Sequence, residues 1–253
     1  MSDKKIPKKK PKNLHDGHRE RMRGKFIEFG LDVFSDHEVI EKLLYYVVPR
    51  KNTNELAHKM LNEFGTIYDL FNAHTLDIQR RTGISEGGAV LFSMMPHLFK
   101  RYKLSENEEK MKFESSCRLG EFIKVCFIGK VYESFFVMCL NGRLEVIAHK
   151  TIQEGTLDVV QLNMRDILEF VIRHKAKYIV LAHNHPSGDP TPSQADLNAT
   201  VDISQILKKF DIDVIDHFLI TSDNYVSFAE HGYLDKSGIV GIEEFIKRKK
   251  KAK

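Results

Sequence analysis

Residues 178–196 read YIVLAHNHPSGDPTPSQAD, and this stretch decides the fold of the second half of the chain. Its first five residues form an apolar run of the length and composition of a buried strand. The prolines and the glycine that follow predict a loop. Ser193 stands three residues before Asp196, a spacing typical of a helix start. The stretch therefore predicts a strand, a loop and a helix in succession.

The residues on either side extend this pattern. Helical spacing recurs over residues 162–176 and 193–210. Residues 131–140 are rich in aromatic and β-branched side chains and end at Asn141-Gly142, a strong hairpin signal, so a second strand is expected over 143–152. Further strands are expected at the ranges 212–220 and 225–228. The second half of the chain is thus predicted to be a mixed α/β domain.

The first half has a different periodicity. From residue 36 to residue 102 the apolar side chains recur at helical spacing, which predicts an all-helical unit, and residues 103–112 are polar and charged, as in a linker. We expect an α+β protein with a domain boundary near residue 110. Its expected parts are a basic arm (1–25), a helical domain (26–104), a linker (105–113), an α/β domain (114–235) and a basic tail (236–253).

The charge is unevenly distributed along the chain. Residues 1–12 hold six lysines and one aspartate, and residues 247–253 hold six basic residues and no acid. Without these ends, 27 basic residues face 34 acidic ones, a net charge of −7. Basic ends of this kind attract nucleic acid without sequence preference by neutralising phosphates. The alternative is that they only increase solubility.

Composition narrows the class of protein further. No apolar run approaches the roughly 20 residues of a membrane span, and the lysine-rich start lacks the apolar segment of a secretion signal, so we expect a cytoplasmic protein that does not enter a membrane. The three cysteines Cys117, Cys126 and Cys139 include no close pair. They indicate neither a disulfide framework nor a thiolate metal site, and we expect them to be small core residues.

Three side chains in the opening stretch suit a divalent metal ion. His183 and His185 are two residues apart at the end of a strand, so both imidazoles can point to one side. Asp196, on the first helical turn, can face back as a third ligand. Two histidines, a carboxylate and an open position for water describe a catalytic zinc site. Taken alone, Ser193 and Asp196 form a capping box, and a lone His-x-His pair is common.

These residues also carry a family resemblance. His-x-His followed, after seven residues, by Ser-x-x-Asp resembles the signature of the JAMM (MPN+) metalloproteases, in the version found in RadC-type (UPF0758) proteins. The resemblance implies a curved β-sheet flanked by helices, with Zn²⁺ held by His183, His185 and Asp196. It implies hydrolysis of a peptide or isopeptide bond in a peptide or protein substrate. Ser193 would then donate a hydrogen bond to the oxyanion.

The same family uses a glutamate from an earlier strand as general base. Glu133 is the best match, although Phe136 stands where many members have glycine. By alternation Glu133 shares a face with apolar residues, where an acid needs a partner such as metal-bound water. Glu145 and Glu154 are the competing candidates.

Residues 82–89 resemble the hairpin of a helix-hairpin-helix unit, which RadC-type proteins carry and which offers backbone N–H groups to a DNA phosphate. Gly83-Ile84-Ser85 replaces the usual Gly-Ile-Gly, and Glu86 adds a negative charge. A glycine turn that lets two helices pack is the alternative. Two hypotheses follow: a zinc hydrolase, or a DNA-associated accessory protein of DNA repair whose metal site is structural or vestigial.

Overall fold

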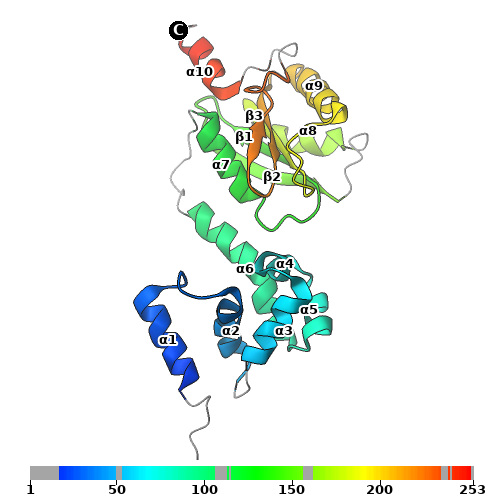
Figure 1. The fold of residues 1–253 in the computed structure, drawn as a ribbon. Coiled ribbons are helices and arrows are strands. Elements are labelled where there is room, and N and C mark those ends of the chain that lie inside the picture. The colour runs from blue at the N-terminus through cyan, green and yellow to red at the C-terminus, as the bar shows by residue number, and fades with distance from the viewer. Residues whose placement is uncertain are drawn as a thin grey trace, which may run out of the picture. The chain divides into compact units, whose positions relative to one another are not determined.

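The structure is a computed structural model, and it describes residues 17–49, 53–105, 113, 115–155, 162–234, 239 and 241–251. The chain divides into two compact units, Met1–Pro96 and His97–Lys253. Ten helices and five strands lie within the described ranges (Figure 1). No helix in the described ranges is long and apolar enough to cross a membrane.

Helices make up the secondary structure of the first unit in its described residues. They are α1 (His18–Phe29), α2 (Asp36–Val47), α3 (Asn54–Phe64), α4 (Ile67–Asn72), α5 (Thr75–Thr82) and α6 (Glu86–Ser105), which continues into the second unit. Their apolar faces meet in one core, as the helical spacing of the sequence predicts. Its fully buried members include Ile40, Leu44, Met60, Leu70, Ile78 and Phe92.

The basic arm expected over residues 1–25 differs from the structure at its end. Residues 1–16 lie outside the described residues, but α1 begins at residue 18 and runs through position 25. Polar contacts hold this helix on its own unit: the Arg19 guanidinium donates to the Val48 carbonyl at 2.9 Å, and Lys25 Nζ lies 3.1 Å from Glu38 Oε1. Residues 18–25 therefore belong to a helix that contacts α2.

The division between the units also differs from the boundary expected near residue 110. It falls at residue 96, inside α6, and most of the expected linker lies outside the described residues. The last turns of α6 belong to the second unit because Leu104 packs against its core and Lys100 donates to the Cys126 carbonyl.

A five-stranded sheet forms the centre of the second unit. Its strands are β1 (Ser134–Leu140), β2 (Val146–Glu154), β3 (Tyr178–Asn184), β4 (Asp213–Ile220) and β5 (Tyr225–Ser227), in the order β2-β1-β3-β4-β5. The pair β3/β4 is parallel, and the other three pairs are antiparallel. The predicted mixed α/β domain is confirmed. β1 and β3 are buried at every position, which explains their continuous apolar sequences.

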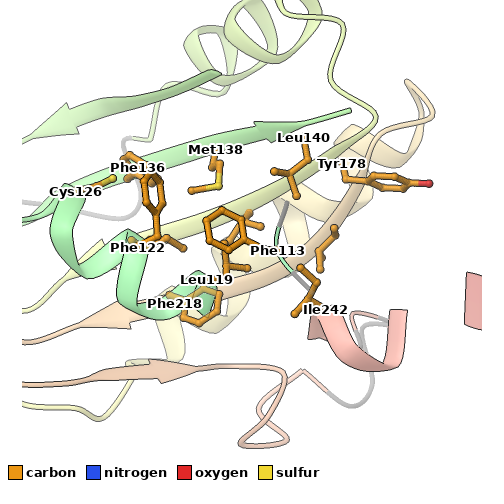
Figure 2. Close-up of a cluster of buried hydrophobic side chains, with 14 of the residues drawn as sticks. Phe113, Leu119, Phe122, Cys126, Phe136, Met138, Leu140, Tyr178, Phe218 and Ile242 are labelled. Carbon is orange, nitrogen blue, oxygen red and sulfur yellow. The ribbon is translucent and has the colours of Figure 1, made fainter. Parts of the chain in front are cut away.

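Helices cover both faces of this sheet (Figure 1). On one face, α7 (Ser116–Cys126) and α10 (Gly241–Lys251) pack over a cluster that Figure 2 shows in close-up, including Leu119, Phe122, Met138, Phe218 and Ile242. On the other face, α8 (Met164–Arg173) and α9 (Gln194–Lys208) pack over Val137, Ile167, Val171, Leu181 and Leu207. The second face carries the candidate site.

The hairpin between β1 and β2 is confirmed, but its turn is longer than two residues. It runs over residues 141–145, and Leu144 rather than Gly142 has a positive φ of 67°. The Asn141 side chain stabilises this loop because its Oδ1 accepts from the backbone N–H groups of Arg143 and Glu145. An asparagine can thus set a longer turn as well as a two-residue one.

Two further expectations need correction. Cys117 is exposed near the start of α7, whereas Cys126 and Cys139 are buried core residues as predicted. The expected tail over residues 236–253 contains α10, in which Ile242 is fully buried and the Phe245 ring lies 4.8 Å from that of Tyr178. An apolar face at the start of α10 therefore anchors it. Positions 236–238, 240 and 252–253 lie outside the described residues.

Candidate metal centre

The end of β3 and the start of α9 bring three side chains together. His183 is in β3, His185 follows the strand, and Asp196 lies on the first turn of α9. The backbone N–H of His185 donates to the Ile220 carbonyl at the end of β4, at 2.9 Å. The chain therefore stays extended through both histidines, and they point to one side as the sequence predicts.

The spacing of the three side chains fits one metal ion. His183 Nε2 lies 3.2 Å from His185 Nε2 and 3.5 Å from Asp196 Oδ1, and His185 Nε2 lies 3.8 Å from Asp196 Oδ2. Ligand atoms about 2.0–2.1 Å from a tetrahedral zinc ion are separated by about 3.4 Å. All three separations are close to that value, so the two histidines and the aspartate form a group that could hold a metal ion.

The remaining polar atoms of these side chains are held by the protein. His185 Nδ1 lies 3.0 Å from the Asp189 carbonyl, which can only accept, so the ring hydrogen is on Nδ1 and Nε2 keeps its lone pair. His183 Nδ1 lies 2.8 Å from His217 Nε2. Such outer contacts orient metal ligands in proteins.

Ser193 and Asp196 form a capping box as well as belonging to this site. The Ser193 hydroxyl and backbone N–H donate to Asp196 Oδ2 at 2.6 Å and 2.8 Å, and Asp196 N–H donates back to Ser193 Oγ. Burial by itself would raise the pKa of Asp196, but a protonated His183 and these hydrogen bonds from Ser193 lower it below its ordinary range. The carboxylate is thus ionised at neutral pH, as a metal ligand must be.

Two buried residues behind the ligands were not assigned a role from the sequence. His217 Nδ1 lies 2.6 Å from Thr200 Oγ1, and Thr200 donates to the Asp196 carbonyl, also at 2.6 Å. Burial lowers the pKa of His217 well below its ordinary value. Thr200 follows Asp196 by one helical turn, and that spacing is the signal that could have identified it.

A β-bulge turns His217 toward the site. Ile179 pairs with Val214, but Val180 pairs with Asp216, so Ile215 is an extra residue in β4. The bulge brings His217, rather than Asp216, to the face that carries His183.

Asp216 points to the opposite face of the sheet and is fully buried. Its carboxylate accepts from the Ser227 hydroxyl at 2.6 Å and from the backbone N–H groups of His217 and Ala229. Burial outweighs these hydrogen bonds and raises its pKa to about 7. Asp216 joins β4 to the end of β5 and contributes no atom to the metal centre.

Glu133 lies one position before β1, not inside a strand as expected. Ser134 N–H donates to the Asn184 side-chain Oδ1 at 2.8 Å, and Asn184 Nδ2 donates to the Tyr132 carbonyl at 3.1 Å. The Asn184 side chain thus takes the place of backbone hydrogen bonds between β1 and β3 at Ser134 and Tyr132. Phe135 pairs with His183, and Glu133 precedes Phe135 by two residues, so it lies at the same end of β1 as that pairing.

The carboxylates of the competing glutamates have other partners, although Glu154 pairs across β1 with Ser134, the neighbour of Glu133. Glu145 is in the hairpin loop, where its carboxylate accepts from Asn141 Nδ2 at 2.6 Å. This loop follows the end of β1 opposite to Phe135, the residue that pairs with His183. Glu154 lies on the edge strand β2 and pairs with Lys130 at 2.6 Å. Their partners are an amide and an ammonium group outside the metal centre.

The glycine turn between α5 and α6 has a clear packing role. Gly83 has a φ of 76°, and the following Ile84 is buried. A Cβ on Gly88 would lie 2.5 Å from Ile84 Cγ1, so this glycine gives Ile84 its space. Ser85 Oγ accepts from the Gly88 N–H at 3.3 Å and caps the helix. These contacts support the packing interpretation of the turn.

The sheet, its helices and the His-His-Asp group define an α/β domain with a group that could hold a metal ion, and comparison with known proteins agrees. A family model described as a RadC-like JAB domain matches residues 113–233. A UPF0758 protein of Fusobacterium nucleatum subsp. nucleatum is 34% identical over 228 residues, which cover 87% of this chain and 98% of that relative. A UPF0758 protein of Janthinobacterium sp. (strain Marseille) is 32% identical over 85% of this chain and 96% of its own length.

The chain therefore belongs to the UPF0758 family, whose members have a RadC-like JAB domain. The resemblance inferred from the sequence is confirmed. JAB domains include metallohydrolases, which agrees with a site that could hold a metal ion.

Proposed function

We propose that this protein is a zinc-dependent hydrolase of the JAMM type that cleaves a peptide or isopeptide bond. The observation that carries the proposal is the spacing of His183 Nε2, His185 Nε2 and an Asp196 oxygen at 3.2–3.8 Å from one another. Two neutral imidazoles and one carboxylate leave a fourth position open, which is the ligand set of catalytic rather than structural zinc sites.

A zinc ion held by His183, His185 and Asp196 would supply Lewis acidity that lowers the pKa of water from about 16 to about 7. Glu133 takes the proton of the attacking water and returns it to the leaving amine. Its place two residues before Phe135, which pairs with His183, supports this role.

Ser193 donates a hydrogen bond to the substrate carbonyl oxygen as negative charge develops on it. Its hydroxyl donates to Asp196 Oδ2 in the structure, but the Ser193 backbone N–H donates to the same oxygen. The hydroxyl can therefore turn to a substrate while Asp196 keeps a hydrogen bond.

Metal analysis together with cleavage of a peptide library tests the proposal. We expect Glu133→Gln to retain zinc and lose turnover, because the amide cannot accept the proton. We expect His183→Ala to lose zinc and turnover together. Glu154→Gln is the matched control, since its carboxylate pairs with Lys130 outside the metal centre.

The outcome separates the parts of the proposal. A Glu133→Gln protein that turns over like the wild type contradicts the assignment of the base. Loss of turnover in Glu154→Gln, with Glu133→Gln active, transfers that role to Glu154. If the zinc-loaded protein cleaves no member of a diverse library, the proposed hydrolase activity is contradicted.

The alternative function is a DNA-associated accessory protein with a structural or vestigial metal site. It is supported by the basic ends of the chain, of which Lys247 and Lys251 are exposed one turn apart on α10. Phosphate neutralisation by such side chains needs no base contacts. Both functions are compatible within one molecule.

A further inference from the structure

A continuous chain of hydrogen bonds runs behind the proposed metal centre. It starts at His183 Nδ1, passes through His217 Nε2 at 2.8 Å and from His217 Nδ1 to Thr200 Oγ1 at 2.6 Å, and ends at the Asp196 carbonyl oxygen, 2.6 Å from the Thr200 hydroxyl. All four residues are buried, with His217 1% and Thr200 0% exposed. This series of hydrogen bonds thus joins the side chain of His183 to the backbone of Asp196, both of which are proposed ligands.

The hydrogens in this chain have one consistent arrangement. A carbonyl oxygen only accepts, so the single hydrogen of the Thr200 hydroxyl points to Asp196. Thr200 Oγ1 must then accept from His217, whose ring hydrogen is therefore on Nδ1. A neutral imidazole has one N–H, so His217 Nε2 accepts from the Nδ1–H of His183.

This arrangement has a direct consequence for the proposed ligand. With its hydrogen on Nδ1, His183 keeps the lone pair on Nε2, the nitrogen that faces His185 and Asp196. The opposite tautomer would point an N–H at the metal position and could not bind a cation. The Thr200 hydroxyl, which touches neither imidazole of the proposed ligand pair, thus selects the tautomer of His183.

Aromatic contacts keep the His217 ring in place. Phe228 stacks on it with centroids 4.5 Å apart, and the Phe135 ring meets it edge-on at 5.8 Å. The His217 ring therefore has little freedom to turn away from His183 and Thr200.

We infer that Thr200 and His217 are positioning residues that hold His183 as an Nε2 ligand and so set the affinity of the site for zinc. The inference rests on the proposed function, because it assumes that His183, His185 and Asp196 bind a metal. Outer contacts of this kind commonly change metal affinity about 10–100-fold.

The test compares Thr200→Val with Thr200→Ser in the full-length protein. Valine is close in shape to threonine but has no hydroxyl, so His217 Nδ1–H loses its acceptor, and serine keeps that acceptor. We expect Thr200→Val to raise the dissociation constant for zinc about 10–100-fold, measured by competition with a chromophoric chelator, and Thr200→Ser to stay close to the wild type. Thr221→Val is the matched control, since the Thr221 hydroxyl bonds to the backbone of Asn224 in the turn after β4.

A second measurement does not depend on a variant that folds. Long-range ¹H–¹⁵N spectra of the zinc-loaded wild type report which nitrogen of each histidine carries hydrogen. We expect Nδ1–H for both His183 and His217. A hydrogen on His217 Nε2 overturns the inference, as does unchanged zinc affinity in Thr200→Val or an equal loss in Thr200→Ser. A wild type that binds no zinc overturns the proposed function as well, whereas the other outcomes leave it standing.

Discussion

The side-chain oxygen of Asn184 accepts a hydrogen bond from the backbone N–H of Ser134 at 2.8 Å. The amide nitrogen of the same side chain donates to the Tyr132 carbonyl. One buried amide therefore holds the residues on both sides of Glu133, and it belongs to the residue between the two histidines of the proposed metal centre. The candidate base and the candidate ligands are joined by this single side chain.

We predict that Asn184→Leu retains zinc but lowers kcat for a cleaved peptide at least tenfold. Leucine has a similar volume but neither donor nor acceptor, so the segment with Glu133 loses its anchor. Two unpaired backbone groups should also cost about 1–3 kcal/mol of unfolding free energy. Hydrogen exchange at the Ser134 amide should accelerate in the same variant. Unchanged exchange and kcat would contradict the anchoring role, and replacement of the exposed Asn198 by alanine is the control.

The second prediction concerns Asp216 and pH. Burial raises its pKa to about 7 in the folded state, against about 3.9 in an unfolded chain. Between these values the folded protein binds more protons, so the contribution of Asp216 to stability falls as pH rises from about 4 to 7. The wild type should lose up to about 4 kcal/mol of unfolding free energy relative to Asp216→Asn over this range. Denaturant titrations of metal-free protein measure it, and parallel curves would contradict it.

The third prediction uses two adjacent glycines of α6. Gly88→Ala would put a Cβ 2.5 Å from the buried Ile84 side chain, which should destabilise the first unit by about 1–3 kcal/mol. Gly87→Ala meets nothing within 4 Å and should stabilise the helix by about 0.5–1 kcal/mol. Urea unfolding of the two variants measures the difference. Equal stability would show that Ile84 does not require this glycine.

Much of the fold and the ligand set could be predicted because the signals are local. Residues 178–182 form a continuous apolar run because β3 is buried on both faces, and the two-residue spacing of His183 and His185 fixes their common side. α7 was not predicted, although Leu119, Phe122, Ile123 and Cys126 recur at helical spacing and would have indicated it.

The rest of the site depends on pairing between distant segments. His217 reaches His183 only because β4 lies beside β3 with a bulge at Ile215, which no local pattern reveals. Asn184 likewise pairs with residues fifty positions earlier in the chain. Sequence spacing indicated the candidate ligands, whereas tertiary contacts determine what orients them.

The fourth prediction tests the nucleic-acid hypothesis. If the basic ends neutralise phosphates, affinity for duplex DNA should fall steeply with salt, and the logarithmic slope should become shallower when residues 1–12 and 247–253 are removed. Fluorescence anisotropy at several salt concentrations measures both slopes. Residues 1–12 lie outside the described residues, but their deletion tests their charge directly. The same weak, salt-independent signal in both proteins would contradict DNA binding through the ends.

Zinc stoichiometry tests the central claim most directly. After removal of bound metal and dialysis against limiting zinc, the wild-type protein should hold one zinc ion per chain, because His183, His185 and Asp196 supply three ligand atoms at suitable spacing. A protein in which all three are replaced by alanine should hold none. A wild type without zinc, or a triple variant that still holds one ion per chain, would contradict the account.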